Sequence, residues 1–189
     1  MRKQTAPAPP YGTSGSSSAP IPNFIKDGTF RKPQATANGY LAIGGPDTDL
    51  MGAWEVKAGK LVVVYSPGYT QTSHQAVDIG GAGLEQAFEV PVDANVEITW
   101  MHSRNTDPTC PGETNQAYGA DVRDAADNRV LASHHYEPDG ADFVQISPEL
   151  TLKFTANRSS SYILTFTGRA PKACGALIYN VVGRGASGR

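Results

Sequence analysis

The sequence has no long apolar run and no excess of charge of either sign. No stretch approaches the roughly 18 apolar residues that a membrane-spanning helix needs, so we expect no membrane span. Lysine and arginine number 16 against 18 acidic residues, a formal net charge of -2, and no basic patch predicts a nucleic-acid partner. Met1-Arg2-Lys3 has the charge of a signal-peptide start, but a polar, proline-rich segment follows it. The chain as numbered is therefore predicted to carry no secretion signal.

Cysteine is scarce, because the chain contains only Cys110 and Cys174. Two buried thiols and one disulfide are both consistent with that number. Each cysteine lies in a turn-like segment, at 108–112 and 172–175, whereas a core thiol more often lies in the middle of a strand. This context favours a disulfide.

Helical periodicity is hard to find, and alternation with a period of two takes its place. In the segments 84–90, 96–101, 150–155 and 162–167, large apolar residues occupy every second position, which puts each set on one face of a sheet. The continuous apolar segment 61–65 is typical of a strand buried on both sides. Further strands are expected near 75–79, 117–123, 129–136, 143–147 and 176–182. About ten short strands separated by turn residues predict an all-β fold, a two-sheet antiparallel β-sandwich or jelly roll.

The ends of the chain differ from this pattern. Residues 1–22 are rich in proline, serine and glycine and have almost no large apolar side chain, so they cannot bury enough surface to offset the entropy of ordering. We expect a disordered, flexible N-terminal arm at 1–22, a sandwich domain at 23–182 and a short C-terminal tail at 183–189. Such an arm can order against a partner.

Several segments resemble one family of β-sandwich modules. They include the opening strand Asn23-Phe24-Ile25-Lys26-Asp27-Gly28-Thr29-Phe30, then Trp54-Glu55-Val56, and finally Ala173-Cys174-Gly175-Ala176-Leu177-Ile178-Tyr179-Asn180-Val181. Their order is similar to that of the galactose-binding-like modules called domain of unknown function 642, or choice-of-anchor C. The resemblance covers nearly all of residues 23–182. It implies a galactose-binding-like sandwich, paired cysteines, an extracellular or cell-surface location and a polysaccharide or other glycan as partner.

The sequence departs from that family at two positions connected with calcium. The resemblance implies an acidic residue after the phenylalanine of the opening motif and an aspartate before the asparagine near the end. Here the two positions hold Arg31 and Tyr179. Calcium binds several oxygen ligands, carboxylates above all. We therefore expect that folding does not need calcium, and no other metal or cofactor is predicted.

No segment has the pattern of a catalytic or metal-binding motif. His134 and His135 are adjacent on an expected strand, so their side chains point to opposite faces and cannot chelate one ion. The acids within 121–127 lack the spacing of a calcium loop, and the glycine-rich segment 80–83 leads into a strand instead of a helix. No serine or cysteine has a recognisable base partner. These absences predict that the protein is not an enzyme.

Aromatic and polar residues in the loops are the candidates for ligand binding. Sugar rings present apolar C–H faces that stack on aromatic rings, while their hydroxyl groups need polar neighbours. Tyr69 and His74 lie in one expected loop, and Arg104 and Asn105 lie in another. Loops gather at the ends of a sandwich, so we predict a ligand site there.

Two functions fit this interpretation. The first is a non-catalytic surface module that recognises carbohydrate on a cell wall or particle. The alternative is a virion accessory protein, a capsid decoration or tail component that attaches to capsid or other assembly proteins through the N-terminal arm.

Overall fold

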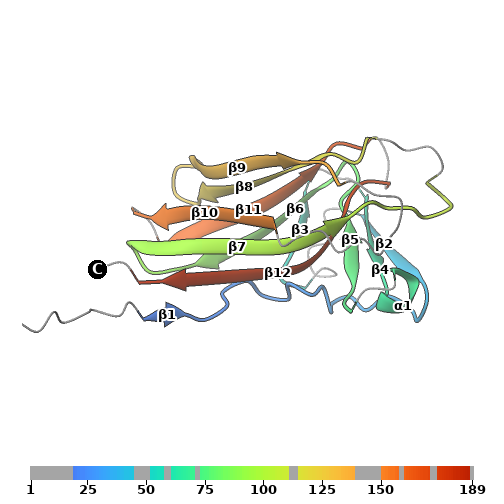
Figure 1. Ribbon diagram of the computed structural model, residues 1–189, viewed down its shortest axis with the longest axis horizontal. Helices are drawn as coiled ribbons and strands as arrows, with labels where there is room; N and C mark the ends of the chain where they lie inside the picture. Colours follow the sequence, from blue (N-terminus) through green and yellow to red (C-terminus); the bar gives the residue numbers. More distant parts are fainter. Residues whose placement is uncertain are drawn as a thin grey trace, which may run out of the picture.

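The computed structural model describes residues 19–44, 52–57, 61–70, 73–110, 115–138, 150–157, 160–170 and 174–187. Within these ranges the chain forms two packed antiparallel sheets and one four-residue helix, α1 (Pro67–Thr70) (Figure 1). The predicted β-sandwich is confirmed. No helix of the described residues is long and apolar enough to cross a membrane.

The larger sheet, sheet A, has the strand order β10–β7–β12–β5–β4–β2, and β1 pairs with the far end of β12. Its strands are β1 (Pro20–Ile21), β2 (Tyr40–Gly44), β4 (Leu61–Tyr65), β5 (Ala76–Asp78), β7 (Ala94–Ser103), β10 (Leu150–Ala156) and β12 (Leu177–Ala186). The smaller sheet, sheet B, has the order β3–β6–β11–β8–β9. Its strands are β3 (Glu55–Lys57), β6 (Gly83–Glu89), β8 (Tyr118–Asp124), β9 (Val130–Tyr136) and β11 (Ser161–Gly168).

The ends of the domain differ from the expected boundaries. The last strand runs to Ala186 instead of ending near residue 182, and Pro20–Ile21, expected to belong to the arm, pairs with its final residues. This pairing gives backbone N–H and C=O groups of both segments a partner within the protein, where an unpaired tail would expose them to water. Residues 1–18 of the expected arm and the expected strand at 143–147 lie outside the described residues.

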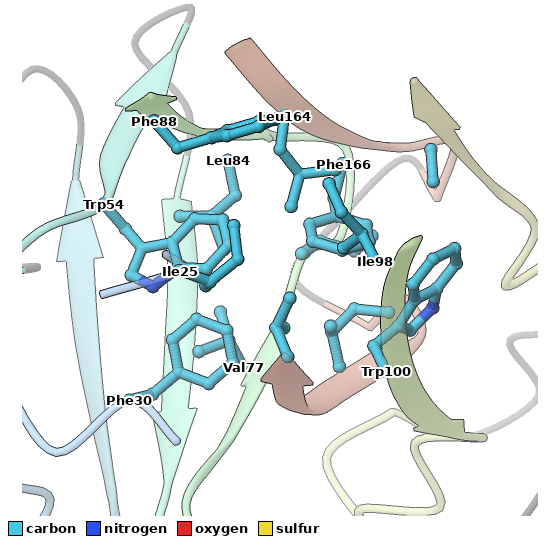
Figure 2. Close-up of a cluster of buried hydrophobic side chains, with 14 of the residues drawn as sticks. Ile25, Phe30, Trp54, Val77, Leu84, Phe88, Ile98, Trp100, Leu164 and Phe166 are labelled. Carbon is cyan, nitrogen blue, oxygen red and sulfur yellow. The ribbon is translucent and has the colours of Figure 1, made fainter. Parts of the chain in front are cut away.

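The main core lies between the two sheets and follows the alternation of the strands. Trp54, Trp100, Leu84, Leu164 and Phe166 are all less than 2% exposed, and Figure 2 shows them converging from both sheets. The Trp100 indole nitrogen donates a hydrogen bond of 2.8 Å to the Tyr118 hydroxyl, so this large ring is buried without an unpaired donor.

A second, smaller apolar cluster lies on the outer face of sheet A. It consists of Val63, Tyr65, Ala76, Leu177 and Tyr179, with Tyr69 and Met101 packed against it. Val62 and Val64 face the main core while Val63 and Tyr65 face this outer cluster, so β4 is buried on both sides as predicted. The outer cluster forms the floor of the candidate site.

Candidate functional site

Three tyrosine rings gather at the edge of sheet A, where β2, β4 and α1 meet. The register of β2 and β4 places Tyr40 opposite Tyr65, and their ring centroids are 5.8 Å apart. Tyr69 on α1 stacks on Tyr65 at 5.4 Å and meets Tyr40 edge-on at 6.3 Å. Tyr65 is buried, Tyr69 is half-buried and Tyr40 is 52% exposed. We call Tyr40, Tyr65 and Tyr69 the tyrosine cluster; it is an aromatic surface with its outermost ring open to solvent.

Local hydrogen bonds fix the tyrosine cluster in place. The helix α1 begins directly after β4, and the amides of Tyr69 and Thr70 both donate to the Ser66 carbonyl oxygen. The Ser66 amide donates to the Gly39 carbonyl oxygen. In return, the Gly39 amide donates to the side-chain hydroxyl of Ser66 at 3.1 Å. These reciprocal bonds join the start of β2 to the start of α1. The positions of Tyr40 and Tyr69 are therefore set by hydrogen bonds of the neighbouring residues Gly39 and Ser66.

The Asp107 carboxylate borders the tyrosine cluster. The Tyr69 hydroxyl donates to Asp107 Oδ2 at 2.5 Å, and the amide and hydroxyl of Thr109 donate to Asp107 Oδ1. Burial acts to raise the pKa of Asp107, but these hydrogen bonds outweigh it and the pKa lies below its usual value. The same bond to Asp107 raises the pKa of Tyr69 to about 12. At neutral pH the pair is therefore a carboxylate and a phenol that donates to it.

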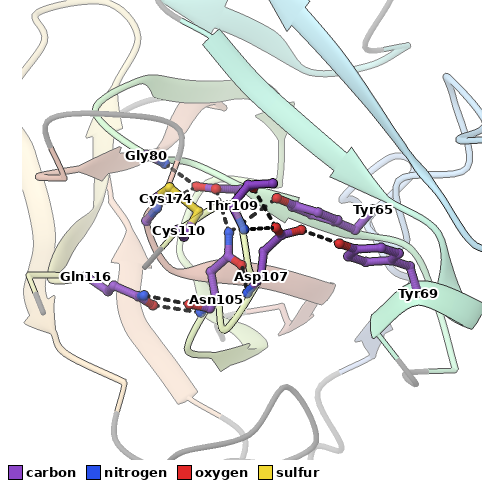
Figure 3. The surroundings of a disulfide bond; sticks show 11 residues. Tyr65, Tyr69, Gly80, Asn105, Asp107, Thr109, Cys110, Gln116 and Cys174 are labelled. Carbon is purple, nitrogen blue, oxygen red and sulfur yellow. Dashed lines mark hydrogen bonds between the residues drawn. A yellow bond between two sulfur atoms is a disulfide. The ribbon is translucent and has the colours of Figure 1, made fainter. Parts of the chain in front are cut away.

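A buried network anchors the loop that carries Asp107. Asp78 is fully buried, and its carboxylate accepts hydrogen bonds from the amides of Gly80 and Gly175 and from Asn105 Nδ2 at 2.8 Å. Burial raises the pKa of Asp78 to about 7. The Asn105 Oδ1 atom accepts from the Asp107 amide at 3.0 Å, so one side chain connects the two aspartates. Figure 3 shows Asn105 and Asp107 with the hydrogen bonds among the residues drawn.

The predicted disulfide joins the same loop to the start of β12. Cys110 and Cys174 are bonded, with their α-carbons 5.5 Å apart (Figure 3). Gln116 adds a second tie, because its amide group both accepts from the Asn105 amide and donates to the Asn105 carbonyl. A covalent bond and buried hydrogen bonds together hold the loop over the outer cluster.

A polar hollow of about 710 Å³ lies beside α1. Its described walls come from residues 29–38, 66–68 and 73–75. Pro67 and Gly68, which line it, belong to the same short helix as Tyr69. His74 lines it and is half-buried. The hollow and the tyrosine cluster therefore share α1 as a common wall.

The residues predicted from sequence have different positions in this arrangement. Tyr69 belongs to the tyrosine cluster and His74 to the hollow, whereas Arg104 is half-buried in the loop before Asn105. Asn105 is only 2% exposed and its side chain bonds Asp78 and Tyr65, so it holds the loop and presents no surface to a ligand. Asp107 is likewise only 2% exposed, so it positions Tyr69 and presents no surface to a ligand. Sequence reasoning missed Tyr40, since nothing in the sequence indicates that β2 pairs with β4 in this register.

The Asp27 carboxylate of the opening motif is already hydrogen-bonded to the backbone, and the expectation that folding does not need calcium stays a prediction. Both carboxylate oxygens of Asp27 accept backbone amides, from Arg31 at 2.7 Å and from Lys32 at 3.0 Å. Tyr179 is buried in the outer cluster. No group of three acidic, histidine or cysteine residues in the described part of the chain could hold a metal ion. Backbone amides thus occupy the carboxylate that an ion would need.

No protein-family model matches this sequence, and no curated protein matches it. Membership of the domain of unknown function 642 family therefore stays a prediction. Solved structures do match. A Stig cyclase from Fischerella sp. TAU, solved with a pyrrolidinylidene-indole, has a TM-score of 0.64 and 16% identity over 90% of this chain and 100% of that one.

Two further neighbours act on or bind carbohydrate. An arabinose-bound family 51 α-L-arabinofuranosidase matches with a TM-score of 0.53 and 11% identity over 87% of this chain, which spans 26% of that protein. A family 61 carbohydrate-binding module in complex with β-1,4-galactotriose matches with a TM-score of 0.44 and 13% identity over 87% of this chain and 92% of that one. Known carbohydrate-binding modules thus occur among the structural neighbours of this β-sandwich.

The prediction that the protein is not an enzyme is wrong. The Fischerella cyclases share the fold across 90% of this chain, and they are enzymes. The error has a physical cause, because a sandwich brings together side chains from strands and loops that are distant in sequence. The absence of a linear motif is therefore no evidence against catalysis. At 16% identity the likeness is one of fold.

Proposed function

We propose that this protein binds carbohydrate through the tyrosine cluster and the adjoining polar hollow. The observation that supports this most strongly is the arrangement of Tyr40, Tyr65 and Tyr69, with the outermost ring 52% exposed and the Asp107 carboxylate at the border. The exposed ring of Tyr40 packs at an angle against the two other rings, so it is restrained before binding and a ligand that covers it costs little side-chain entropy.

The chemistry of the site suits a sugar. The apolar C–H face of a pyranose ring can cover the exposed ring of Tyr40, and burial of that aromatic surface is favourable. Sugar hydroxyl groups need polar partners, which Asn38 and His74 offer in the hollow next to the cluster. Apolar and polar recognition elements therefore lie side by side, as a ligand with one face of each kind requires.

We also propose that the protein works outside the cell, on a wall or cell surface. The Cys110–Cys174 disulfide supports this location, because disulfides persist in oxidising compartments. The resemblance to the domain of unknown function 642 modules supports the same location and a glycan partner.

A glycan array followed by calorimetry on the bound oligosaccharides tests the proposal. Tyr40→Ala should weaken binding about tenfold, since loss of one stacked ring removes on the order of 1.4 kcal/mol or more. Tyr69→Ala should weaken it as well, whereas Tyr69→Phe keeps the ring and reports on the bond to Asp107 alone. Leu61→Ala is the matched control, because Leu61 is exposed and apolar on the same sheet but lies outside the cluster. Each bound glycan is also analysed for products, so that turnover is detected.

Two results would contradict the proposal. The first is an array on which no glycan is bound. The second is a bound glycan whose affinity is the same for Tyr40→Ala, Tyr69→Ala and the unaltered protein.

A further inference from the structure

Arg31 lies between two hollows on the surface of the sandwich. One is the polar hollow beside α1, and the other, of about 850 Å³, is lined by the segments 23–32 and 180–182 with Gly52 and Ala53. Arg31 lines both, and its side chain is exposed. Arg31 therefore borders the space in which we place the ligand.

The loop that carries Arg31 is held in one conformation by hydrogen bonds to its backbone. Asp27 and Phe30 both have positive φ angles, of 48° and 53°, and the Asp27 carboxylate accepts the amides of Arg31 and Lys32. The Trp54 indole donates to the Asp27 carbonyl at 3.1 Å. Because only the backbone of Arg31 takes part in these contacts, its side chain is presented from a preorganised loop.

Among the described residues the Arg31 side chain has no salt-bridge partner, and from Arg31 the Asp27 carboxylate accepts only the backbone amide. In the part of the chain that the structure describes, neither Arg31 nor Lys32 forms a salt bridge, although Lys57, Arg123 and Lys153 do. The described residues that line the hollow beside α1 include no aspartate or glutamate. The described lining of this hollow combines hydroxyl and amide groups with one permanent cation and no acid, and such a lining attracts a ligand that carries both hydroxyl groups and a negative charge.

We propose that Arg31 selects an acidic sugar by binding its carboxylate. The planar guanidinium group can donate two parallel hydrogen bonds to a carboxylate, a geometry that a neutral hydroxymethyl group cannot match. This inference rests on the proposed function, since it specifies which class of carbohydrate the site takes. The tyrosine cluster supplies affinity for the sugar face, and Arg31 supplies the preference for the charged form.

Matched oligosaccharides that differ only at C6 test this inference. Oligomers of glucuronate, galacturonate and mannuronate are compared by calorimetry with oligomers of glucose, galactose and mannose that have the same linkage and length. In at least one pair the acid should bind about tenfold more tightly at low salt, because a charge-assisted hydrogen bond adds on the order of 1.4 kcal/mol or more. Arg31→Gln should remove this preference, and added salt should reduce it.

Arg129→Gln is the matched control, because Arg129 is exposed on the β8–β9 turn, in the other sheet. Its affinities should equal those of the unaltered protein. Inorganic phosphate is titrated as a free-anion probe and should displace the acidic sugar only weakly. Arg31→Gln should also leave the melting temperature unchanged, since the contacts of residue 31 with Asp27 involve the backbone.

The outcomes separate this inference from the proposed function. Equal affinity for acid and neutral sugars, with binding that Tyr40→Ala still weakens, would overturn the role of Arg31 and leave the proposed function standing. An acid preference that survives in Arg31→Gln would do the same. Displacement by phosphate as strongly as by the acidic sugar itself would replace the inference with a general anion site. Absence of binding to every oligosaccharide would overturn both.

Discussion

The clearest test of how this site is built is the substitution Asn105→Ala. Asn105 is 2% exposed and connects Asp78 on β5 to the loop that carries Asp107. Alanine removes the whole amide group while it leaves the backbone bonds to Gln116 possible. The substitution therefore isolates the side-chain bridge between the two aspartates.

The free energy of unfolding that Asn105→Ala loses follows from three hydrogen bonds. The variant loses the bonds from Asn105 Nδ2 to Asp78 Oδ2 at 2.8 Å and to the Tyr65 hydroxyl at 3.4 Å, and the bond from the Asp107 amide to Asn105 Oδ1 at 3.0 Å. It leaves a buried carboxylate oxygen and a buried amide without those partners. An unsatisfied buried group costs about 1–3 kcal/mol, and more when it is charged, so we expect a loss of roughly 3–5 kcal/mol. For a domain of this size that corresponds to a fall in melting temperature of roughly 10 °C or more.

The loss should also depend on pH. Burial raises the pKa of Asp78 to about 7, so the carboxyl group is mostly protonated at pH 5 and ionised at pH 8. The donor from Asn105 matters most to the ionised form. The variant should therefore lose more stability at pH 8 than at pH 5.

Urea unfolding followed by circular dichroism measures these differences, with the disulfide kept oxidised. Asn95→Ala is the matched control, because Asn95 is exposed and its side chain accepts one bond, from the Thr155 hydroxyl. We expect the control to stay within about 0.5 kcal/mol of the unaltered protein. A loss below about 1 kcal/mol for Asn105→Ala, or an equal loss at both pH values, would refute the reasoning.

Three further predictions concern stability. The pKa of Asp78 in the folded state, about 7, exceeds its unfolded value of about 3.9, so the folded state binds this proton more tightly. The protonated Asp78 therefore stabilises the fold fully below about pH 4, and this contribution is lost as the pH rises to about 7. Between about pH 4 and pH 7 the free energy of unfolding of the unaltered protein should therefore fall relative to that of Asp78→Asn, by at most roughly 4 kcal/mol. A difference between the two proteins that does not change with pH would contradict this. Replacing Cys110 and Cys174 by alanine together should cost roughly 4 kcal/mol in urea unfolding, because the bond closes a loop with a sequence separation of 64; an unchanged midpoint would contradict it. A calcium chelator should leave the melting temperature unchanged, since the carboxylate of Asp27 is occupied by backbone amides, and a large drop would show that other oxygens hold an ion.

The tertiary structure corrects the sequence-based view of the loops most of all. Asn105 looked like an exposed ligand group because it lies in a polar loop, but the loop folds back over the outer cluster and buries it. Tyr40 gave no signal, because a tyrosine at the start of an edge strand has the same local pattern whether or not another ring lies beside it. Its neighbours Tyr65 and Tyr69 are more than 20 residues away in sequence, and only the register of β2 with β4 brings them together.

Local sequence patterns were enough to predict the sandwich and the inward face of its strands, and they favoured the disulfide over two buried thiols. Alternation with a period of two is a local property, so it predicted which side of a strand faces inward, as for Val96, Ile98 and Trp100, which are all buried. With only two cysteines, a disulfide had one possible pairing, Cys110 with Cys174. The site was decided by the tertiary structure alone. Strand register, loop closure and the desolvation of Asp78 depend on contacts between segments far apart in sequence, and no local pattern encodes which of those segments meet.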